Sequence, residues 1–275
     1  MKKMAKVAAL IAAMALVADL TACQKKGAAG GRVQAQDATP YLIIDGTTVM
    51  GYKEGLPANI LIPEGMTEIG QDAFKNCESL ESVVIPEGVT SIGEEAFGSC
   101  NKLASVIIPA SMTKIGKRAF RGCEKLASVV IPDGVTEIGA WAFQSCKNLT
   151  EVTIPGSVEI IQGGAFKECE SLKSVTIADG VTRFWKEVFK DCENLTSVTI
   201  PASVTLIGGD AFSGCGGSLK EINYAGTKAQ WDEIETTYET GYVKRDEYTK
   251  NKKGMYIGFA GIVNCADGVV RVSWY

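Results

Sequence analysis

The sequence predicts a repeat solenoid, mainly β, built from 23-residue units. Each unit would place a strand of a parallel sheet on one face and a short helical or 3-10 turn on the other. Cysteine, phenylalanine and proline each recur at this spacing, with Ala178 in the place of one proline. The recurring cysteines are Cys77, Cys100, Cys123, Cys146, Cys169, Cys192 and Cys215. A fixed spacing of this length over so many units is typical of a solenoid.

One unit shows why the pattern predicts strands and turns. In residues 80–85 (Leu-Glu-Ser-Val-Val-Ile) the apolar side chains alternate at the end of the run, as in a strand with one buried face. Pro86 ends this strand, because proline has no amide hydrogen for the ladder. Residues 89–92 predict a second short extended piece, and residues 94–97 predict a helical or 3-10 turn. No unit can bury its apolar side chains alone, so we expect the units to stack around one interior.

The first residues predict a lipoprotein signal peptide that spans 1–22. Three lysines precede an apolar run at 7–17, which is too short to cross a bilayer and fits a signal sequence. Residues 20–23 (Leu-Thr-Ala-Cys) resemble the lipobox of bacterial lipoproteins, in which the cysteine is acylated. The resemblance implies that Cys23 carries a lipid. The alternative is an ordinary secretory signal, in which Cys23 would have no such role.

The remaining chain is predicted to divide into four parts. These are a flexible tether (23–40), an N-terminal cap hairpin (41–58), the repeats (59–218) and a C-terminal cap module (219–275). The tether is rich in Gly, Ala and Gln, a composition typical of flexible linkers. The dipeptide Asp45-Gly46 favours a tight hairpin turn, which would cover the first repeat. Residues 218–219 follow an extra glycine, so the repeat is expected to slip there by one residue.

The repeat unit resembles the BspA-type leucine-rich repeats, a family of bacterial surface proteins. The match rests on the pattern Leu-x-x-Val-x-Ile-Pro-x-Gly-Val-Thr-x-Ile-Gly-x-x-Ala-Phe-x-x-Cys, which residues 80–100 illustrate, and spans about 41–275. Family members lie outside the cytoplasm, and several are implicated in adhesion. The resemblance implies a similar class of role for this chain, without naming a partner.

The cysteine column has two readings, a structural ladder and a set of disulfides or metal ligands. Every member occupies the same inward position, so the side chains should run parallel instead of facing one another. No Cys-x-x-Cys pair gives the usual zinc spacing. We therefore favour a ladder of small buried thiols, in which free cysteine acts as a compact apolar residue. Cys265 lies outside the column and could pair with Cys215.

Composition argues against several classes of function. The chain has no histidine, which removes Ser-His-Asp and Cys-His nucleophiles and every histidine metal site. The formal net charge of −4 is unlike that of a general nucleic-acid binder, which needs a basic surface. The acidic residues recur at solvated turns, and no phosphate loop or nucleophile elbow is present. The sequence therefore predicts no enzyme, no cofactor and no metal site.

Two features are candidates for binding a partner. The first is the outward position of the predicted sheet, which is apolar in four units and threonine in three: Leu61, Val84, Ile107, Val130, Thr153, Thr176 and Thr199. An exposed apolar stripe often marks an interface, although β-branched residues also stabilise strands through cross-strand pairing. The second is the pair Trp141 and Trp185, where the repeat is irregular. Exposed tryptophans are typical binding anchors, but these two could instead adjust the packing.

These observations predict a non-enzymatic surface lipoprotein that binds a protein or glycan through the repeat surface. It would lie outside the cytoplasm, anchored to the cell membrane or the outer membrane through the lipid on Cys23. The alternative is a structural or scaffolding protein of the envelope that binds a partner in its own cell.

Overall fold

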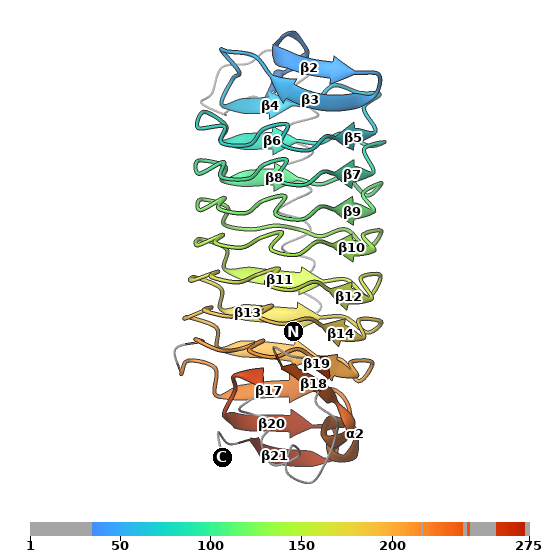
Figure 1. The fold of residues 1–275 in the computed structure, drawn as a ribbon, viewed down its shortest axis with the longest axis vertical. Helices are drawn as coiled ribbons and strands as arrows, with labels where there is room; N and C mark the ends of the chain where they lie inside the picture. Colours follow the sequence, from blue (N-terminus) through green and yellow to red (C-terminus); the bar gives the residue numbers. More distant parts are fainter. Residues whose placement is uncertain (1–34, 216, 239–240, 243–256, 273–275) are drawn as a thin grey trace, which may run out of the picture.

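The computed structural model is an elongated rod of stacked coils (Figure 1). The structure describes residues 35–215, 217–238, 241–242 and 257–272, so the predicted signal peptide and Cys23 lie outside the described residues. Successive coils contribute strands to parallel sheets and pair in register at a spacing of 23 residues. The predicted β solenoid is therefore confirmed.

The first column of strands, which we call the long-strand sheet, runs along one side of the rod. It is interrupted at residues 128–131, which form no strand, and so divides into a four-stranded and a six-stranded part. The four-stranded part contains β1 (Gln36–Asp37), β4 (Asn59–Leu61), β6 (Ser82–Val84) and β8 (Ser105–Ile107). The six-stranded part contains β11 (Glu151–Ile154), β13 (Ser174–Ile177), β15 (Ser197–Ile200), β17 (Glu221–Tyr224), β20 (Gly261–Cys265) and β21 (Gly268–Val272).

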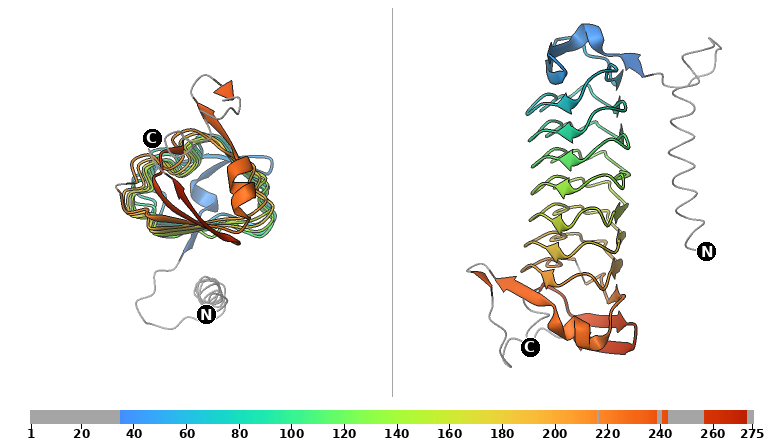
Figure 2. Two further views of the ribbon diagram at one scale, coloured as in Figure 1. Left: turned by 90° about the horizontal axis from the view of Figure 1, so that it is seen from below. Right: turned by 90° about the vertical axis from the view of Figure 1, so that its right-hand side faces the viewer.

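The second column, the short-strand sheet, realises the predicted second extended piece of each unit. Its parallel strands are β5 (Glu68–Ile69), β7 (Ser91–Ile92), β9 (Lys114–Ile115), β10 (Glu137–Ile138), β12 (Ile160–Ile161), β14 (Arg183–Phe184), β16 (Leu206–Ile207) and β18 (Glu235–Tyr238). The hairpin of β2 (Leu42–Asp45) and β3 (Thr48–Tyr52) extends this sheet at one end, and β19 (Gly241–Tyr242) extends it at the other. Figure 2 shows the coils superimposed along the rod axis.

The turn that follows each short strand differs from the expected helical or 3-10 turn. In the unit at 94–100 the backbone makes successive turns without helix, because Glu95 (φ 52°) and Ser99 (φ 58°) both adopt the left-handed conformation. Their N–H groups donate to the carbonyls of Lys117 (2.9 Å) and Arg121 (2.6 Å) in the next coil. The turn is thus shaped by hydrogen bonds to the next coil that alternate with bonds inside the coil, such as the one from Gly98 N–H to the Glu95 carbonyl (2.8 Å).

Glycine ends most of the short strands because neighbouring coils approach closely there. An added Cβ on Gly139 would lie 2.5 Å from the Lys117 nitrogen and 2.6 Å from the carbonyl carbon of Gly116. Gly93 and Gly116 meet the preceding coil in the same way. Even one methyl group would therefore force two coils apart at these positions.

The interior is a continuous column of aromatic rings. Phe74, Phe97, Phe120, Phe143, Phe166, Phe189 and Phe212 are buried, and adjacent rings stack nearly parallel with centroids 5.1–5.8 Å apart. Tyr52 from the hairpin stacks on Phe74 at 5.9 Å and continues the column into the N-terminal end. Phe184 replaces an isoleucine and meets Phe189 edge-on.

The N-terminal end corrects part of the predicted tether (23–40). Gln36 and Asp37 form β1, which pairs in parallel with Ile60 and Leu61 of β4. Ala38 is fully buried, and the short 3-10 helix η1 (Thr39–Tyr41) follows it. These residues are part of the folded body, because they continue the long-strand sheet for one more strand.

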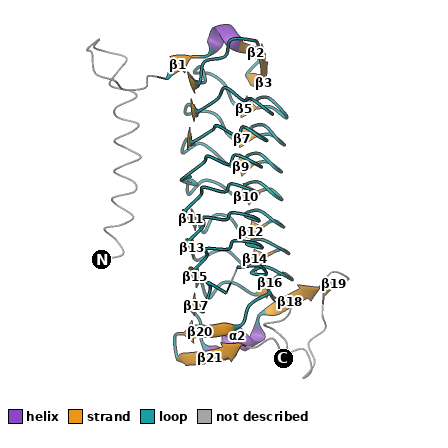
Figure 3. Ribbon diagram, turned by 90° about the vertical axis from the view of Figure 1, so that its left-hand side faces the viewer, coloured by secondary structure: helices purple, strands orange, loops and turns teal. Residues whose placement is uncertain are grey.

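The C-terminal end continues the stack with altered spacing. The pairing partner of Val198 is Ile222, one residue later than a 23-residue step would give, as the extra glycine predicts. Helix α2 (Lys228–Glu233) begins with a capping box between Thr227 and Gln230. Its Trp231 is buried and packs edge-on against Tyr224 of β17. Figure 3 shows β18 and β19 projecting from the side of the rod near this end.

Candidate binding faces

The predicted stripe lies along the outside of the long-strand sheet. In β4, β6 and β8 the residues Leu61, Val84 and Ile107 are in register, and all three are partly exposed. Val130 continues the line at the interruption of the sheet, with 49% of its surface exposed. The structure therefore brings the four apolar residues together on one face.

The second half of the same line is polar. Thr153 is exposed, and Thr176 and Thr199 are partly exposed, all three in register through β11, β13 and β15. The line ends on Asn223 and Asn264, which pair across β17 and β20 and are joined by a side-chain hydrogen bond of 3.3 Å. The face thus changes from apolar to hydroxyl and amide along the rod.

Small side chains border this line. Ser82, Ser105, Ser128, Ser174 and Ser197 occupy the neighbouring outward position, with Glu151 in the place of one serine. Ser82 Oγ donates to Asn59 Oδ1 at 2.6 Å, so this border is ordered by bonds along the stack. A surface with short side chains on a regular sheet is open to contact by a flat partner.

The two tryptophans that the sequence offers as binding candidates, Trp141 and Trp185, lie on the turn side of the rod. They flank one pair of glycines, Gly163 and Gly164. Trp141 is partly exposed and adopts φ 56°, and its ring fills the space that a side chain on Gly164 would need. The Cβ of Trp185, also partly exposed, lies 3.9 Å from the point that a Cβ on Gly163 would occupy. The structure places both tryptophans beside this diglycine turn.

Trp141 is also held by a chain of charged residues. The Arg118 guanidinium lies 5.1 Å from the centre of its ring, a cation–π distance. Arg118 in turn pairs with Glu95 at 3.2 Å, and Glu95 also pairs with Lys75. The hydrogen bond from Lys75, opposed by partial burial, holds the pKa of Glu95 below its usual value. These contacts favour the packing role for Trp141, which was the alternative reading of the sequence pattern.

The cysteine column forms the predicted structural ladder, with a function beyond filling space. Each thiol from Cys100 onward donates to the carbonyl oxygen of the phenylalanine in the preceding coil, at 3.0–3.5 Å. Burial raises the pKa of Cys100 to about 12 and raises those of Cys123, Cys146 and Cys192 well above the usual thiol value. All seven are free and buried. Cys215 and Cys265 are both free thiols, so the suggested disulfide between them is not formed.

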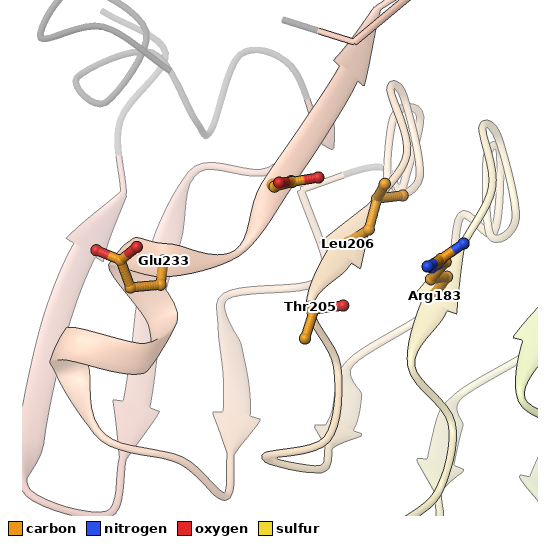
Figure 4. A pocket seen from close by; sticks show the side chains of 5 residues that line it. Arg183, Thr205, Leu206 and Glu233 are labelled. Atoms are coloured by element: carbon orange, nitrogen blue, oxygen red, sulfur yellow. The ribbon is translucent and has the colours of Figure 1, made fainter. Parts of the chain in front are cut away.

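One hollow of about 240 Å³ lies beside the C-terminal end, where sequence reasoning predicted no site (Figure 4). It is lined by Arg183, Thr205, Leu206, Glu233 and Glu235. These side chains come from β14, from β16 and the residue before it, from α2 and from β18, which the sequence pattern does not place together. The hollow offers charged groups of both signs, from Arg183 and the two glutamates, and the hydroxyl of Thr205.

Within the described ranges, no group of Cys, Asp and Glu residues is arranged to hold a metal ion. Over the same residues, every helix is too short or too polar to cross a membrane.

Comparison with known proteins decides the family. The family model described as "BspA type Leucine rich repeat region" matches residues 53–169 and 113–234, with six copies. The chain belongs to the BspA-type leucine-rich repeat family. No curated protein matches this member of the family.

Two solved structures of bacterial leucine-rich repeat proteins resemble this BspA-type chain. The leucine-rich repeat protein of T. pallidum is 30% identical, with a TM-score of 0.60 over 68% of this chain and 91% of that one. A leucine-rich repeat protein from Bacteroides ovatus is 25% identical, with a TM-score of 0.51 over 71% of this chain and 64% of that one. Both agree with the solenoid architecture described above.

The thiol ladder predicts a stability that falls steeply at alkaline pH. A buried thiol with a raised pKa keeps its proton in the folded chain, while the same thiol ionises in the unfolded chain above about pH 8.5. The stability from Cys100 is complete below that pH and is lost as the pH rises toward its raised pKa of about 12, and the stability from Cys123, Cys146 and Cys192, whose pKa values are also raised, is lost in the same direction. Each thiol with a raised pKa should contribute roughly 1.4 kcal/mol of loss per pH unit above about pH 8.5. Urea unfolding midpoints between pH 7 and pH 10 would measure the slope.

The variant Cys146→Ser is the matched control for this measurement. Its hydroxyl can still donate to Phe120, but it does not ionise in this pH range. The slope should therefore become shallower by the contribution of one thiol. An unchanged slope would contradict the assignment of the alkaline loss to the ladder.

Proposed function

We propose that this BspA-type chain is a non-enzymatic, lipid-anchored protein that binds a protein or glycan outside the cytoplasm. The main support is the line of residues on the long-strand sheet, of which Leu61, Val84, Ile107 and Val130 form the apolar half. Proteins of this family are generally protein-binding or adhesion-like, which agrees with an exposed recognition surface. The surface offers a partner an apolar half and a hydroxyl half, aligned along one axis.

The geometry favours the long-strand face over the tryptophan region as the main contact. Trp141 is engaged by Arg118 and Gly164, so part of its surface is already used within the rod. Val130, by contrast, is half exposed, and the serines beside it leave room for a partner. We therefore assign the first contact to the stripe and a secondary one to Trp185.

A binding role also agrees with the chemistry of the chain. Without histidine, the common general base at neutral pH is missing. The buried thiols have raised pKa values, the opposite of an activated nucleophile. These observations support a non-enzymatic function.

Replacing Val84, Ile107 and Val130 together with serine tests the stripe. The chain would first be screened against purified extracellular matrix proteins, a glycan array and envelope proteins of its own cell. For the partner found, the triple variant should bind at least about tenfold more weakly, because three apolar contacts lose their transfer free energy. Isothermal titration would give the affinities.

The control for this test changes Thr90, Thr113 and Thr136 to serine in the same coils. These side chains lie on the short-strand side, and serine keeps the hydroxyls that donate along the stack. Equal affinities of the stripe variant and this control would exclude the stripe. Binding only to envelope proteins of its own cell would favour the scaffolding alternative.

The lipid anchor requires a separate test on Cys23. Cells expressing the full chain and fed radiolabelled palmitate should yield a labelled protein in the membrane fraction. The Cys23→Ser variant should carry no label, because serine lacks the thiol to which the lipid is attached. Label retained by this variant would refute the anchor at Cys23.

A further inference from the structure

Exposed hydrophobic side chains gather at one end of the rod. Among the described residues, five large hydrophobic side chains are exposed, and three of them belong to the β2–β3 hairpin: Ile43 (49%), Ile44 (37%) and Met50 (49%). We call these three residues the cap patch. The other two, Val130 and Val269, lie in the middle of the rod and at its opposite end.

The patch lies where the stacking of coils stops. β2 is the last strand of the eleven-stranded sheet, so the described chain places no further strand beyond it. Leu42 and Val49 of the same hairpin point inward and are buried, whereas Ile43, Ile44 and Met50 remain outside. A hairpin that only closes the interior would need polar residues at these three positions, as caps of solenoids usually have.

We propose that the cap patch contacts the surface of the lipid bilayer to which the chain is anchored. The inference rests on the proposed lipid at Cys23, which lies 12 residues before the first described residue. Twelve residues span at most about 43 Å in any conformation. β1 enters the rod at the end that carries the patch (Figure 2). The anchor therefore holds this end near the membrane.

Aromatic and charged residues of the cap define the kind of contact. Tyr41 and Tyr52 are partly buried against the same end, and tyrosine is typical of the boundary between lipid and water. Asp37, Asp45 and Glu54 are exposed on the cap, and Lys53 is the basic residue among them. A cap with more acidic than basic groups should not prefer anionic lipids, so the contact is apolar in origin.

A second copy of the chain fits the patch less well. Two copies joined along β2 would share a strand of four residues, Leu42–Asp45. Such a contact falls well short of the roughly 800 Å² per partner that stable interfaces bury. A bilayer accepts three exposed apolar side chains of one hairpin without this requirement.

The experiment measures vesicle binding without the acyl chain. The chain from residue 23 onward, carrying Cys23→Ser, is sedimented with vesicles of phosphatidylcholine and with vesicles that also contain phosphatidylglycerol. We expect binding to both, with no increase on the anionic vesicles. The triple change Ile43→Ser, Ile44→Ser and Met50→Ser should lower the partition coefficient roughly tenfold or more, because three half-exposed apolar side chains no longer enter the lipid.

Val269→Ser is the matched control, since it removes an exposed apolar side chain at the opposite end and should leave vesicle binding unchanged. Thermal unfolding of each variant checks that the rod remains folded. Met50→Trp gives a second readout, because brominated lipids should quench the fluorescence of the added tryptophan.

Several results would overturn the inference. These are no vesicle binding by the Cys23→Ser chain, equal binding by the triple variant, or no quenching of the tryptophan at position 50. A dimer in solution that the triple change dissociates, without vesicle binding, would assign the patch to a second copy. If cells do not acylate the chain but the chain still binds vesicles through the cap patch, the proposed anchor is refuted and the membrane contact of the patch is retained.

Discussion

Close backbone contact between successive coils is the constraint on which this rod depends. The left-handed turn residues direct their N–H groups to the next coil, and the glycines that end the short strands let the two backbones meet. This contact sets the distance at which the phenylalanine rings stack and the thiols reach a carbonyl. The apolar interior and the hydrogen-bonded turns therefore require the same spacing and stabilise it together.

The same constraint explains why the residue type can vary at outward positions. Inward positions keep their residue type from coil to coil because each packs on its own equivalents, as the Phe and Cys columns do. Outward positions have no such requirement, so one line can change from Val130 to Thr153 without altering the backbone pattern. A partner would thus be recognised by residues that folding leaves free to differ.

Periodicity predicted most of the fold because every coil repeats one set of contacts. It identified the two strands, the buried columns and the slip before Ser218, since each leaves a signal at a fixed spacing. The conformation of the turn was predicted wrongly, because glutamate and serine, the residue types at positions 95 and 99, do not indicate a left-handed backbone. The predicted tether extends too far, because Gln36 and Asp37 are polar residues typical of a linker. Only their pairing with β4 shows that they form a strand.

The candidate sites were less predictable, because they depend on relations between coils that the repeat does not encode. Sequence spacing located the stripe, since an outward strand position is periodic. It did not show that Trp141 lies over Gly164 or that Arg118 lies against the ring, because these contacts join three different coils. The cap patch was missed since it lies outside the repeat, in a hairpin whose exposed and buried faces the sequence does not distinguish.

The stability of Gly139→Ala measures the contact between coils most directly. A methyl group there meets backbone atoms at about 2.5 Å, whereas one at Gly51 meets its neighbours at 3.6 Å or more. Urea unfolding should show a loss of at least about 2 kcal/mol for Gly139→Ala and less than about 1 kcal/mol for Gly51→Ala. A Gly139→Ala protein as stable as the parent chain would contradict the close contact between coils.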